Sequence, residues 1–520
     1  MTENAAIQYI GVIGAGAMGR GIAQLFAQSG YQIILHDTQP KAMDAALAAI
    51  GDTFKLLAEK GRITDEAGQA HLARITLSTE LAGLKNCQLV VEAIIERLDI
   101  KQQLFKALEA VTSVDCILAS NTSSLSIAAI ASVCAHPERV AGFHFFNPVP
   151  LMKVVEVIRG PRTELRVVEQ LCTLTKSSGH HAVVASDMPG FIVNHAGRGY
   201  GTEALKALGE GVSDIPSIDL ILKEQVVFSA SGAGFKLGPF ELMDLTGLDV
   251  SHPVMESIYQ QFYQEPRYRP SALAAQRYAA GLFGRKTAAG FYRYVDKQQV
   301  FDGERLSWPQ PSSAALLSGL KVALSPCTPK TVGHLISELG ANLVESFSEA
   351  DLVLDCPLGL DLSASLAEQN LVKFASKALA LDTLFPFGFR ACKRRVIMAC
   401  PATLSDTLAI GQALFAADGA QVSVLRDSAG FISQRVVAMI VAVACEMAQL
   451  RIASPEDINE AVRLGLGYPA GPLAMGDALG AAKVFTVLEN LLISTEDPRY
   501  RPPAWLKRRA LLGLNLSQSD

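Results

Sequence analysis

The 520-residue sequence lacks the features that mark several large classes of protein. It has no Lys/Arg-rich run, and its 46 basic and 51 acidic side chains leave a net charge of -5, so no electrostatic footprint for nucleic acid is expected. Its longest apolar run, Val436 to Cys445, is far shorter than the roughly 20 residues that span a bilayer. With 49% hydrophobic residues and ordinary glycine and proline content, neither disorder nor a collagen-like chain fits. A globular protein with no nucleic-acid or membrane partner is predicted.

Cysteine and targeting patterns are also missing. None of the nine cysteines forms a Cys-x-x-Cys pair, so neither a disulfide framework nor a zinc site is indicated, and no metal is expected. The beginning of the sequence has no basic segment followed by an apolar one, the pattern of a secretory signal. We therefore expect a cytoplasmic protein. At roughly 150 residues per domain, the length predicts three or four domains.

The first informative pattern is a glycine-rich turn. A strand-like run from Tyr9 to Ile13 leads into Gly14-Ala-Gly16-Ala-Met-Gly19 and then into a helical pattern. Such a turn lets the backbone approach a pyrophosphate and lets the helix pack closely on the strand. The next strand ends in Asp37, at a spacing where a carboxylate binds the adenosine ribose and repels a 2′-phosphate. Although Asp37 could simply end a strand, the pattern predicts NAD rather than NADP.

Strand-like and helical runs alternate through the first part of the chain. Apolar runs at 88–92, 116–120 and 140–146 are strand-like, and 99–109 has helical spacing. This alternation predicts an α/β fold with a Rossmann-type, doubly wound parallel sheet. Ligands of such sheets gather at the carboxyl ends of the strands, so the residues that follow each strand are candidates for chemistry.

Two polar residues stand in unusual apolar surroundings. His144 lies within Phe-His-Phe-Phe, where a histidine is more often a structural core residue than a catalyst. Glu156 lies within Val-Val-Glu-Val-Ile, where a carboxylate is costly to bury without a partner. A His–Glu pair would explain both, because the carboxylate fixes the ring tautomer while the imidazole exchanges protons near neutral pH. On chemistry alone, both the structural and the catalytic interpretations stay open.

Five ordered motifs resemble those of a known family. They are Gly14-Ala-Gly-Ala-Met-Gly19, Val91-Glu92-Ala-Ile-Ile-Glu96, Ser120-Asn-Thr-Ser-Ser124, His144-Phe-Phe-Asn-Pro-Val-Pro150 and Asp187-Met-Pro-Gly-Phe-Ile-Val-Asn194. Together they closely resemble the L-3-hydroxyacyl-CoA dehydrogenase family over residues 7 to 295. The resemblance implies oxidation of a 3-hydroxyacyl-CoA to the 3-ketoacyl-CoA, with hydride transferred to NAD.

The resemblance also assigns expected roles to residues. His144 matches the catalytic base, Glu156 matches its orienting carboxylate, and Ser123 and Asn194 match side chains that bind the C3 oxygen of the substrate. The positions that match the cofactor site are Gly14, Gly16, Met18, Gly19, Asp37, Glu96, Lys101, Ser123 and Asn147. Those that match contacts to the CoA substrate are Thr53, Lys60 and Asn194.

The C-terminal half repeats motifs of the N-terminal half. Asp427 to Gln434 repeats Asp187 to Asn194 at an offset of 240, and two later motifs repeat at offsets of 233 and 232. Such ordered matches predict a duplicated helical domain. We expect an NAD-binding Rossmann domain (1–186), a helical substrate and dimerisation domain (187–297), a degenerate α/β domain (319–426) and a second helical domain (427–520).

The second copy differs from the first at informative positions. Gln434 replaces Asn194, so we expect the second helical domain to be structural and to stand in for the second subunit of a dimer. After a Pro/Ser-rich linker at Trp308 to Ser313, the 319–426 region starts with a strand-like run and has no glycine fingerprint. It is therefore expected to be a spacer or a decayed nucleotide-binding unit without a second NAD site. Either a homodimer or a monomer with an internal pseudo-dimer fits.

The resemblance leaves the acyl group open. Long members with this two-repeat layout point to 3-hydroxyadipyl-CoA in phenylacetate catabolism, and 3-hydroxybutyryl-CoA of short-chain fatty acid metabolism is the near alternative. A free hydroxy acid, as in the related lambda-crystallin branch, and a catalytically silent NAD-binding structural protein are more distant ones. Arg198, close after Asn194, is a candidate cation for a terminal carboxylate.

Overall fold

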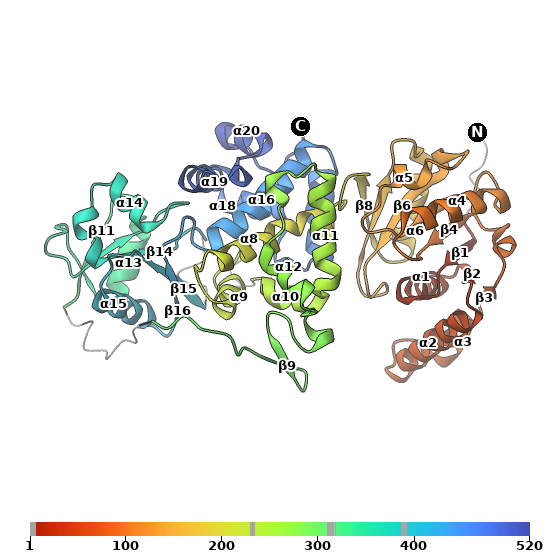
Figure 1. The fold of residues 1–520 in the computed structure, drawn as a ribbon, viewed down its shortest axis with the longest axis horizontal. Helices are drawn as coiled ribbons and strands as arrows, with labels where there is room; N and C mark the ends of the chain where they lie inside the picture. Colours follow the sequence, from red (N-terminus) through yellow and green to blue (C-terminus); the bar gives the residue numbers. More distant parts are fainter. Residues whose placement is uncertain (1–6, 229–233, 309–316, 318, 386–392) are drawn as a thin grey trace. The chain divides into compact units, whose positions relative to one another are not determined.

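The computed structural model describes residues 7–228, 234–308, 317, 319–385 and 393–520 (Figure 1). It divides into two compact units. The first contains Met1–His195 and Leu450–Leu466, and the second contains Ala196–Gln449 and Gly467–Asp520. The domain boundaries expected at residues 186, 297 and 426 stay a prediction.

The first unit is built on an eight-stranded sheet with the order β3-β2-β1-β4-β5-β6-β7-β8. Neighbouring strands are parallel except β6 and β7, which are antiparallel. This confirms the predicted Rossmann-type sheet, with one reversed strand pair that the alternation did not reveal. The strands are β1 (Tyr9–Ile13), β2 (Gln32–His36), β3 (Ile75–Ser78), β4 (Leu89–Glu92), β5 (Ile117–Ser120), β6 (Val140–Phe145), β7 (Val154–Arg159) and β8 (His181–Ser186).

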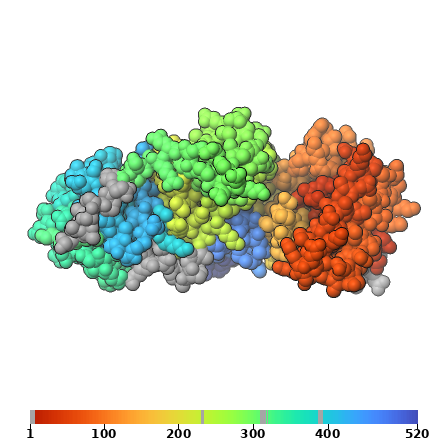
Figure 2. All heavy atoms as spheres, turned by 90° about the horizontal axis from the view of Figure 1, so that it is seen from below, coloured from red at the N-terminus to blue at the C-terminus, as the bar shows by residue number. Residues whose placement is uncertain are grey.

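Helices cover the faces of this sheet because its strands are apolar on both sides. Val12 and Phe143 are fully buried, and Phe26 on α1 packs on Phe143 with ring centroids 6.2 Å apart. In Figure 2 the atoms of this region, red to orange, form one continuous body. The helices are α1 (Ala17–Gln28), α2 (Pro40–Glu59), α3 (Asp65–Leu72), α4 (Leu98–Val111), α5 (Ile127–Ala131), α6 (Leu165–Ser177) and α7 (Val193–Ala196).

The second unit contains a helical core. The apolar run Val436 to Cys445 lies inside α16 (Ser433–Gln449), where every one of its residues is at most 1% exposed. This helix packs against α8 (Arg198–Gly209). The other helices of the two repeats are α9 (Ile215–Glu224), α10 (Pro239–Thr246), α11 (Leu248–Gln261), α12 (Ala272–Ala279), α17 (Pro455–Gly465), α18 (Pro472–Leu479), α19 (Ala481–Thr495) and α20 (Ala504–Leu512).

Within the described part of the chain, no single helix is long and apolar enough to cross a membrane. The pair α18 and α19 meets that test only when the two are joined, and they are bent by 97° at their junction.

The second unit also holds a six-stranded sheet with the order β12-β11-β13-β14-β15-β16. Again only one neighbouring pair, β14 and β15, is antiparallel. The strand-like runs that the sequence shows at 320–324, 351–355, 395–400 and 421–425 are confirmed as β11, β13, β15 and β16, whereas β12 and β14 were not foreseen. Linker residues 309–313 lie outside the described residues. The strands are β11 (Lys321–Leu324), β12 (Asn342–Leu343), β13 (Leu352–Asp355), β14 (Ala378–Leu381), β15 (Arg394–Ala399) and β16 (Gln421–Arg426), and helices α13 (Lys330–Glu338), α14 (Leu362–Glu368) and α15 (Ser405–Ala416) accompany them.

Each helical repeat contributes a helix that packs on the sheet of the other half of the chain. In the first unit, α17 of the second repeat packs on β7 and β8, and the N–H of Ser186 donates to the carbonyl of Ile452 at 2.7 Å. In the second unit, α9 of the first repeat contacts β15, and the N–H of Arg426 donates to the carbonyl of Val212 at 3.2 Å. Both members of the second hydrogen bond stand 240 positions from their counterparts in the first, so the duplication extends to tertiary contacts.

Candidate active site

The glycine turn joins β1 to α1 in a conformation that needs glycine. Gly14 has φ +100°, and a β-carbon there would lie 2.5 Å from the carbonyl oxygen of Ala93. Gly19 follows in α1, where a β-carbon would overlap the Gly14 carbonyl. Around Gly16, which caps α1, a β-carbon would meet no atom within 4 Å. The turn is therefore tight on its inner side and open at the helix N-terminus, where backbone N–H groups bind phosphate.

Asp37 lies beside this turn, directly after β2. Its Oδ2 accepts a hydrogen bond from the N–H of Ala15 at 2.8 Å, and its Oδ1 accepts one from the N–H of Gln39 at 2.9 Å. These bonds hold the carboxylate at the edge of the turn, and its contact to a ribose stays a prediction. Met18, in the first turn of α1, is partly buried against the core.

A cluster of hydroxyl groups surrounds Glu96, which follows β4. Its Oε1 accepts hydrogen bonds from the hydroxyl of Thr122 at 2.6 Å, from the N–H of Ser123 at 2.9 Å and from the hydroxyl of Ser124 at 3.0 Å. Burial opposes ionisation, but these donors and the nearby Lys101 ammonium lower the pKa of Glu96. The carboxylate therefore fixes the backbone of the loop that carries Ser123.

Lys101 reaches this cluster from α4. Its side chain is 1% exposed, and the ammonium lies 2.5 Å from Oε1 of Glu92 and 3.3 Å from Oε2 of Glu96. Glu92 also accepts from the hydroxyl of Ser120 at 2.6 Å. Since Lys101 is enclosed by carboxylates, we expect it to affect a cofactor through Glu96. The support from Glu92 and Ser120 was not predicted, although the position of Glu92 at the end of a buried strand could have indicated it.

The predicted His–Glu pair is formed across β6 and β7. The antiparallel register places His144 directly opposite Glu156, and Nδ1 of His144 lies 2.5 Å from Oε2 of Glu156. The two side chains are 6% and 0% exposed. The rings of Phe146 and Phe191 lie 4.5 and 5.9 Å from the imidazole. Because Nδ1 is engaged by the carboxylate, Nε2 is the ring nitrogen left for proton exchange with a substrate.

Backbone amides hold the second oxygen of Glu156. Its Oε1 accepts from the N–H of Ile192 at 2.9 Å and from the N–H of Val193 at 2.8 Å. The next residue, Asn194, donates from Nδ2 to the carbonyl of Ser123 at 3.4 Å. The structure thus brings Glu156 together with His144 on one side and with the backbone beside Asn194 on the other, and Asn194 contacts Ser123. Asn147, three residues after His144, is exposed.

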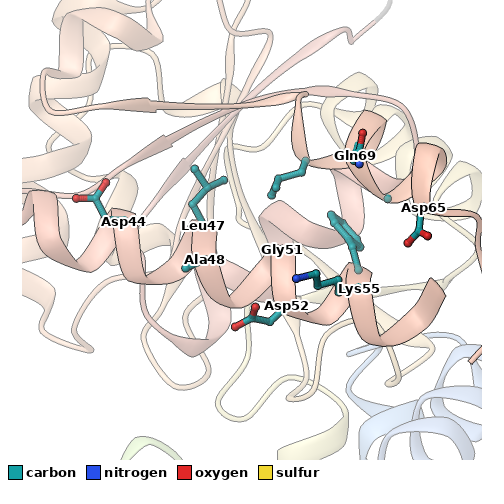
Figure 3. Close-up of a pocket in the computed structure, with 11 residues that line it drawn as sticks. Asp44, Leu47, Ala48, Gly51, Asp52, Lys55, Asp65 and Gln69 are labelled. Carbon is teal, nitrogen blue, oxygen red and sulfur yellow. The ribbon is translucent and has the colours of Figure 1, made fainter. Parts of the chain in front are cut away.

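The residues expected to bind CoA lie on α2. The hydroxyl of Thr53 donates to the carbonyl of Ala49 at 2.8 Å, and the exposed Lys60 caps the C-terminus of the helix. A hollow of about 570 Å³ lies between α2 and α3, as Figure 3 shows. Neither Thr53 nor Lys60 lines it. Its lining is Asp44, Leu47, Ala48, Gly51, Asp52, Phe54, Lys55, Asp65, Gly68, Gln69 and Leu72.

Comparison with known proteins decides the family. The family description "3-hydroxyacyl-CoA dehydrogenase, NAD binding domain" matches residues 9–188, and "3-hydroxyacyl-CoA dehydrogenase, C-terminal domain" matches residues 190–294 and again 430–518. The chain belongs to the 3-hydroxyacyl-CoA dehydrogenase family. It is therefore an NAD-dependent 3-hydroxyacyl-CoA dehydrogenase, and both the predicted duplication of its helical domain and the predicted cofactor are confirmed.

Individual relatives of this dehydrogenase match it over different lengths. The 3-hydroxyadipyl-CoA dehydrogenase of Escherichia coli (strain K12) is 35% identical over 97% of this chain and 98% of that protein. A probable 3-hydroxybutyryl-CoA dehydrogenase of Deinococcus radiodurans is 40% identical over 55% of this chain and 99% of its own length. A solved structure described as 3-hydroxybutyryl-CoA dehydrogenase from Escherichia coli K12 has a TM-score of 0.83 and 34% identity, and covers 97% of this chain and 98% of that one.

The second half of this dehydrogenase has a different group where the first has its His–Glu pair. Extending the register of β14 against β15 places Asp382 at the position of His144, opposite Val396 rather than a glutamate. Asp382 is buried and accepts hydrogen bonds from Gln225, Gln434 and Ser433. Within the described residues, no group of three or more His, Cys, Asp or Glu side chains could hold a metal ion.

Proposed function

We propose that this dehydrogenase oxidises a 3-hydroxyacyl-CoA whose acyl chain ends in a carboxylate, with 3-hydroxyadipyl-CoA as the substrate. One observation carries this proposal: the chain matches the 3-hydroxyadipyl-CoA dehydrogenase of Escherichia coli over 97% of its length and 98% of that protein, through both helical repeats. This match extends through both helical repeats and is not confined to the catalytic half.

In the proposed mechanism, His144 is the general base. Its Nε2 takes the proton from the C3 hydroxyl of the substrate, and Glu156 stabilises the imidazolium that forms, because its carboxylate lies 2.5 Å from Nδ1. Ser123 and Asn194 donate hydrogen bonds to the C3 oxygen. In the reverse direction the imidazolium returns the proton, and the same donors support the negative charge that builds on the oxygen.

The turn and strand ends of the first sheet fit the predicted cofactor. The open space at Gly16 and the N-terminus of α1 suit a pyrophosphate, and Asp37 suits an unphosphorylated ribose. Glu96, Met18 and Asn147 complete the set of residues that would hold it, and Lys101 would act through Glu96. When bound, NAD supplies the hydride acceptor for C3.

A second candidate substrate is 3-hydroxybutyryl-CoA. The solved structure with a TM-score of 0.83 carries that description, and so does the Deinococcus relative. The two candidates differ in charge at the end of the acyl chain, which makes Arg198 the residue to test. Burial lowers the pKa of Arg198 to about 10, partly offset by the neighbouring Tyr468, so its guanidinium stays charged at neutral pH.

Turnover with paired substrates tests the proposal. We expect kcat/KM for 3-hydroxyadipyl-CoA to exceed that for 3-hydroxybutyryl-CoA by at least about 10-fold, the usual value of one charge-assisted contact. Arg198→Met should reduce the adipyl value selectively. Equal losses on both esters would remove Arg198 from the proposal, and a preference for the butyryl ester would favour the second candidate. NAD binding without turnover of either ester would favour the structural-protein alternative.

Three further expectations belong to this proposal. The resemblance to long family members favours a role in phenylacetate catabolism and a cytoplasmic location. The exchanged contacts of the two repeats favour a monomer with an internal pseudo-dimer over a homodimer. Mass measurement in solution tests the last of these directly.

A further inference from the structure

The end of α17 lies against the backbone that holds Glu156. A β-carbon at Gly465 would lie 2.9 and 3.1 Å from the two γ-carbons of Val193 and 3.5 Å from Cγ1 of Val154. Val154 stands two residues before Glu156 on β7, and the N–H of Val193 donates to Oε1 of Glu156. Gly465 therefore touches both segments that fix the orientation of this carboxylate.

The rest of α17 is seated firmly on the same sheet. The carbonyl of Ile452, just before the helix, accepts from the N–H of Ser186 at 2.7 Å. Oδ2 of Asp457 lies 3.5 Å from the N–H of Val184 on β8. The residues that α17 buries are Pro455, Ile458, Ala461 and Val462. Because the helix is held at its start and along one face, the position of Gly465 at its end is determined by the sheet.

The corresponding position in the other half carries a side chain. Gln225 stands 240 positions before Gly465, and its Nε2 donates to Oδ2 of Asp382 at 2.7 Å. Asp382 takes the place of His144 in that half. In the half that lacks a His–Glu pair, the end of this helix therefore carries the polar side chain of Gln225. In the half that has the pair, the corresponding residue is Gly465, which has no side chain.

We propose that Gly465 is a positioning residue for the His144–Glu156 pair. The second helical repeat, through the end of α17, holds β7 and the Val193 amide against Glu156, and Glu156 in turn orients His144. This inference rests on the catalytic roles proposed for His144 and Glu156. A side chain at position 465 would clash with Val193, whose N–H binds Glu156, and a misplacement of about 1 Å can cost 100-fold in rate.

The test uses the full-length chain and acetoacetyl-CoA reduction by NADH. We expect Gly465→Val to lower kcat by at least 10-fold, with NADH affinity, measured by fluorescence, within twofold of wild type. Gly465→Ala should lower kcat by a smaller factor. Adding Val193→Ala to Gly465→Ala removes the two γ-carbons that the new methyl group meets, so the double variant should return to within twofold of Val193→Ala alone. Gln225→Ala is the matched control and should leave kcat unchanged.

Two results would overturn the proposal. One is wild-type kcat in Gly465→Val. The other is a loss that Val193→Ala does not relieve and that comes with an equal loss of NADH affinity and of thermal stability, as expected for general damage to the fold. His144→Gln tests the proposed mechanism separately from the positioning role of Gly465. Wild-type turnover in His144→Gln would contradict the proposed mechanism. An inactive His144→Gln together with a fully active Gly465→Val would contradict only the positioning role.

Discussion

Gln434 donates a hydrogen bond from Nε2 to Oδ1 of Asp382 at 2.9 Å, and both side chains are buried. In the duplicated chain these two residues stand where Asn194 and His144 stand in the first half. Asp382 accepts further hydrogen bonds from the side chains of Gln225 and Ser433 and from the N–H of Leu384. In the second half, the positions of His144 and Asn194 are therefore occupied by two buried side chains that bond to each other.

Replacing Asp382 should affect stability but not catalysis. Asp382→Ala removes an acceptor of three buried side chains, of which only Gln434 keeps another within the described residues, the Pro357 carbonyl, and each unmet donor costs about 1–3 kcal/mol. We expect the free energy of unfolding to fall by about 3 kcal/mol or more, while kcat per folded molecule stays within twofold of wild type. Denaturant titration and steady-state kinetics measure the two effects. Asp302→Ala removes the exposed partner of Arg293 and should change stability by less than about 1 kcal/mol.

Loss of His144 should act on the chemical step. We expect His144→Gln to lower kcat by about 10²–10⁴, the usual contribution of general acid–base catalysis, with NADH affinity retained. His136 offers a matched control, because it pairs with Glu138 at 3.0 Å on the exposed surface. His136→Gln should keep full turnover. Near-wild-type kcat in His144→Gln would remove this residue from the mechanism.

The choice of cofactor should depend on Asp37. We expect Asp37→Ser to lower kcat/KM for NAD by about 10- to 100-fold, the range for loss of hydrogen bonds to a charged group, and to raise the use of NADP relative to NAD. Kinetics with both cofactors measure this ratio. The exposed Asp115 is a suitable control position. An unchanged ratio of NADP to NAD use would show that a group other than Asp37 recognises the adenosine ribose.

The stability of the helical domain should depend on the ionisation of Asp219. Burial raises the pKa of Asp219 to about 7. Hydrogen bonds from the hydroxyl of Tyr292 at 2.7 Å and from the N–H of Phe240 at 3.0 Å lower this pKa and so partly oppose the effect of burial. Because this pKa lies above the unfolded value near 3.9, stability present below pH 4 is lost as the pH rises through 7, by up to about 4 kcal/mol.

The second repeat has Asn459 at the matching position, which suggests the variant to use. Between pH 4 and 7, the melting temperature of the wild-type protein should fall relative to that of Asp219→Asn, because only the wild type carries this carboxyl group. A difference in melting temperature between wild type and variant that stays constant across this range would contradict a raised pKa for this carboxyl group.

Local patterns were enough to predict the nucleotide-binding half. The glycine turn, Asp37 and the strand ends are short-range features, because each depends on the chain a few residues to either side. The His144–Glu156 pair was also predictable as chemistry, since both residues are anomalous in apolar runs. The antiparallel register that joins them was not, because strand direction depends on long-range pairing that single-strand patterns do not show.

Other features depend entirely on contacts between distant segments. Nothing in the local sequence around Asp382 indicates that it takes the place of His144, since that equivalence follows from the register of β14 against β15. The same holds for Gly465, which is an ordinary glycine after a helix until Val193 is placed beside it. Sequence offsets of 232 to 240 identified the repeat, but they gave no sign that a helix of each repeat packs on the sheet of the other half.

The position of residues 450–466 in the first unit also bears on how the protein is made. The edge strand β8 is complete once Ser186 has left the ribosome, yet the segment that bonds to it arrives more than half a chain later. At about 5–20 residues per second, that interval is on the order of tens of seconds. During synthesis the nascent sheet therefore lacks the segment that covers this edge, and an exposed sheet edge is prone to aggregation.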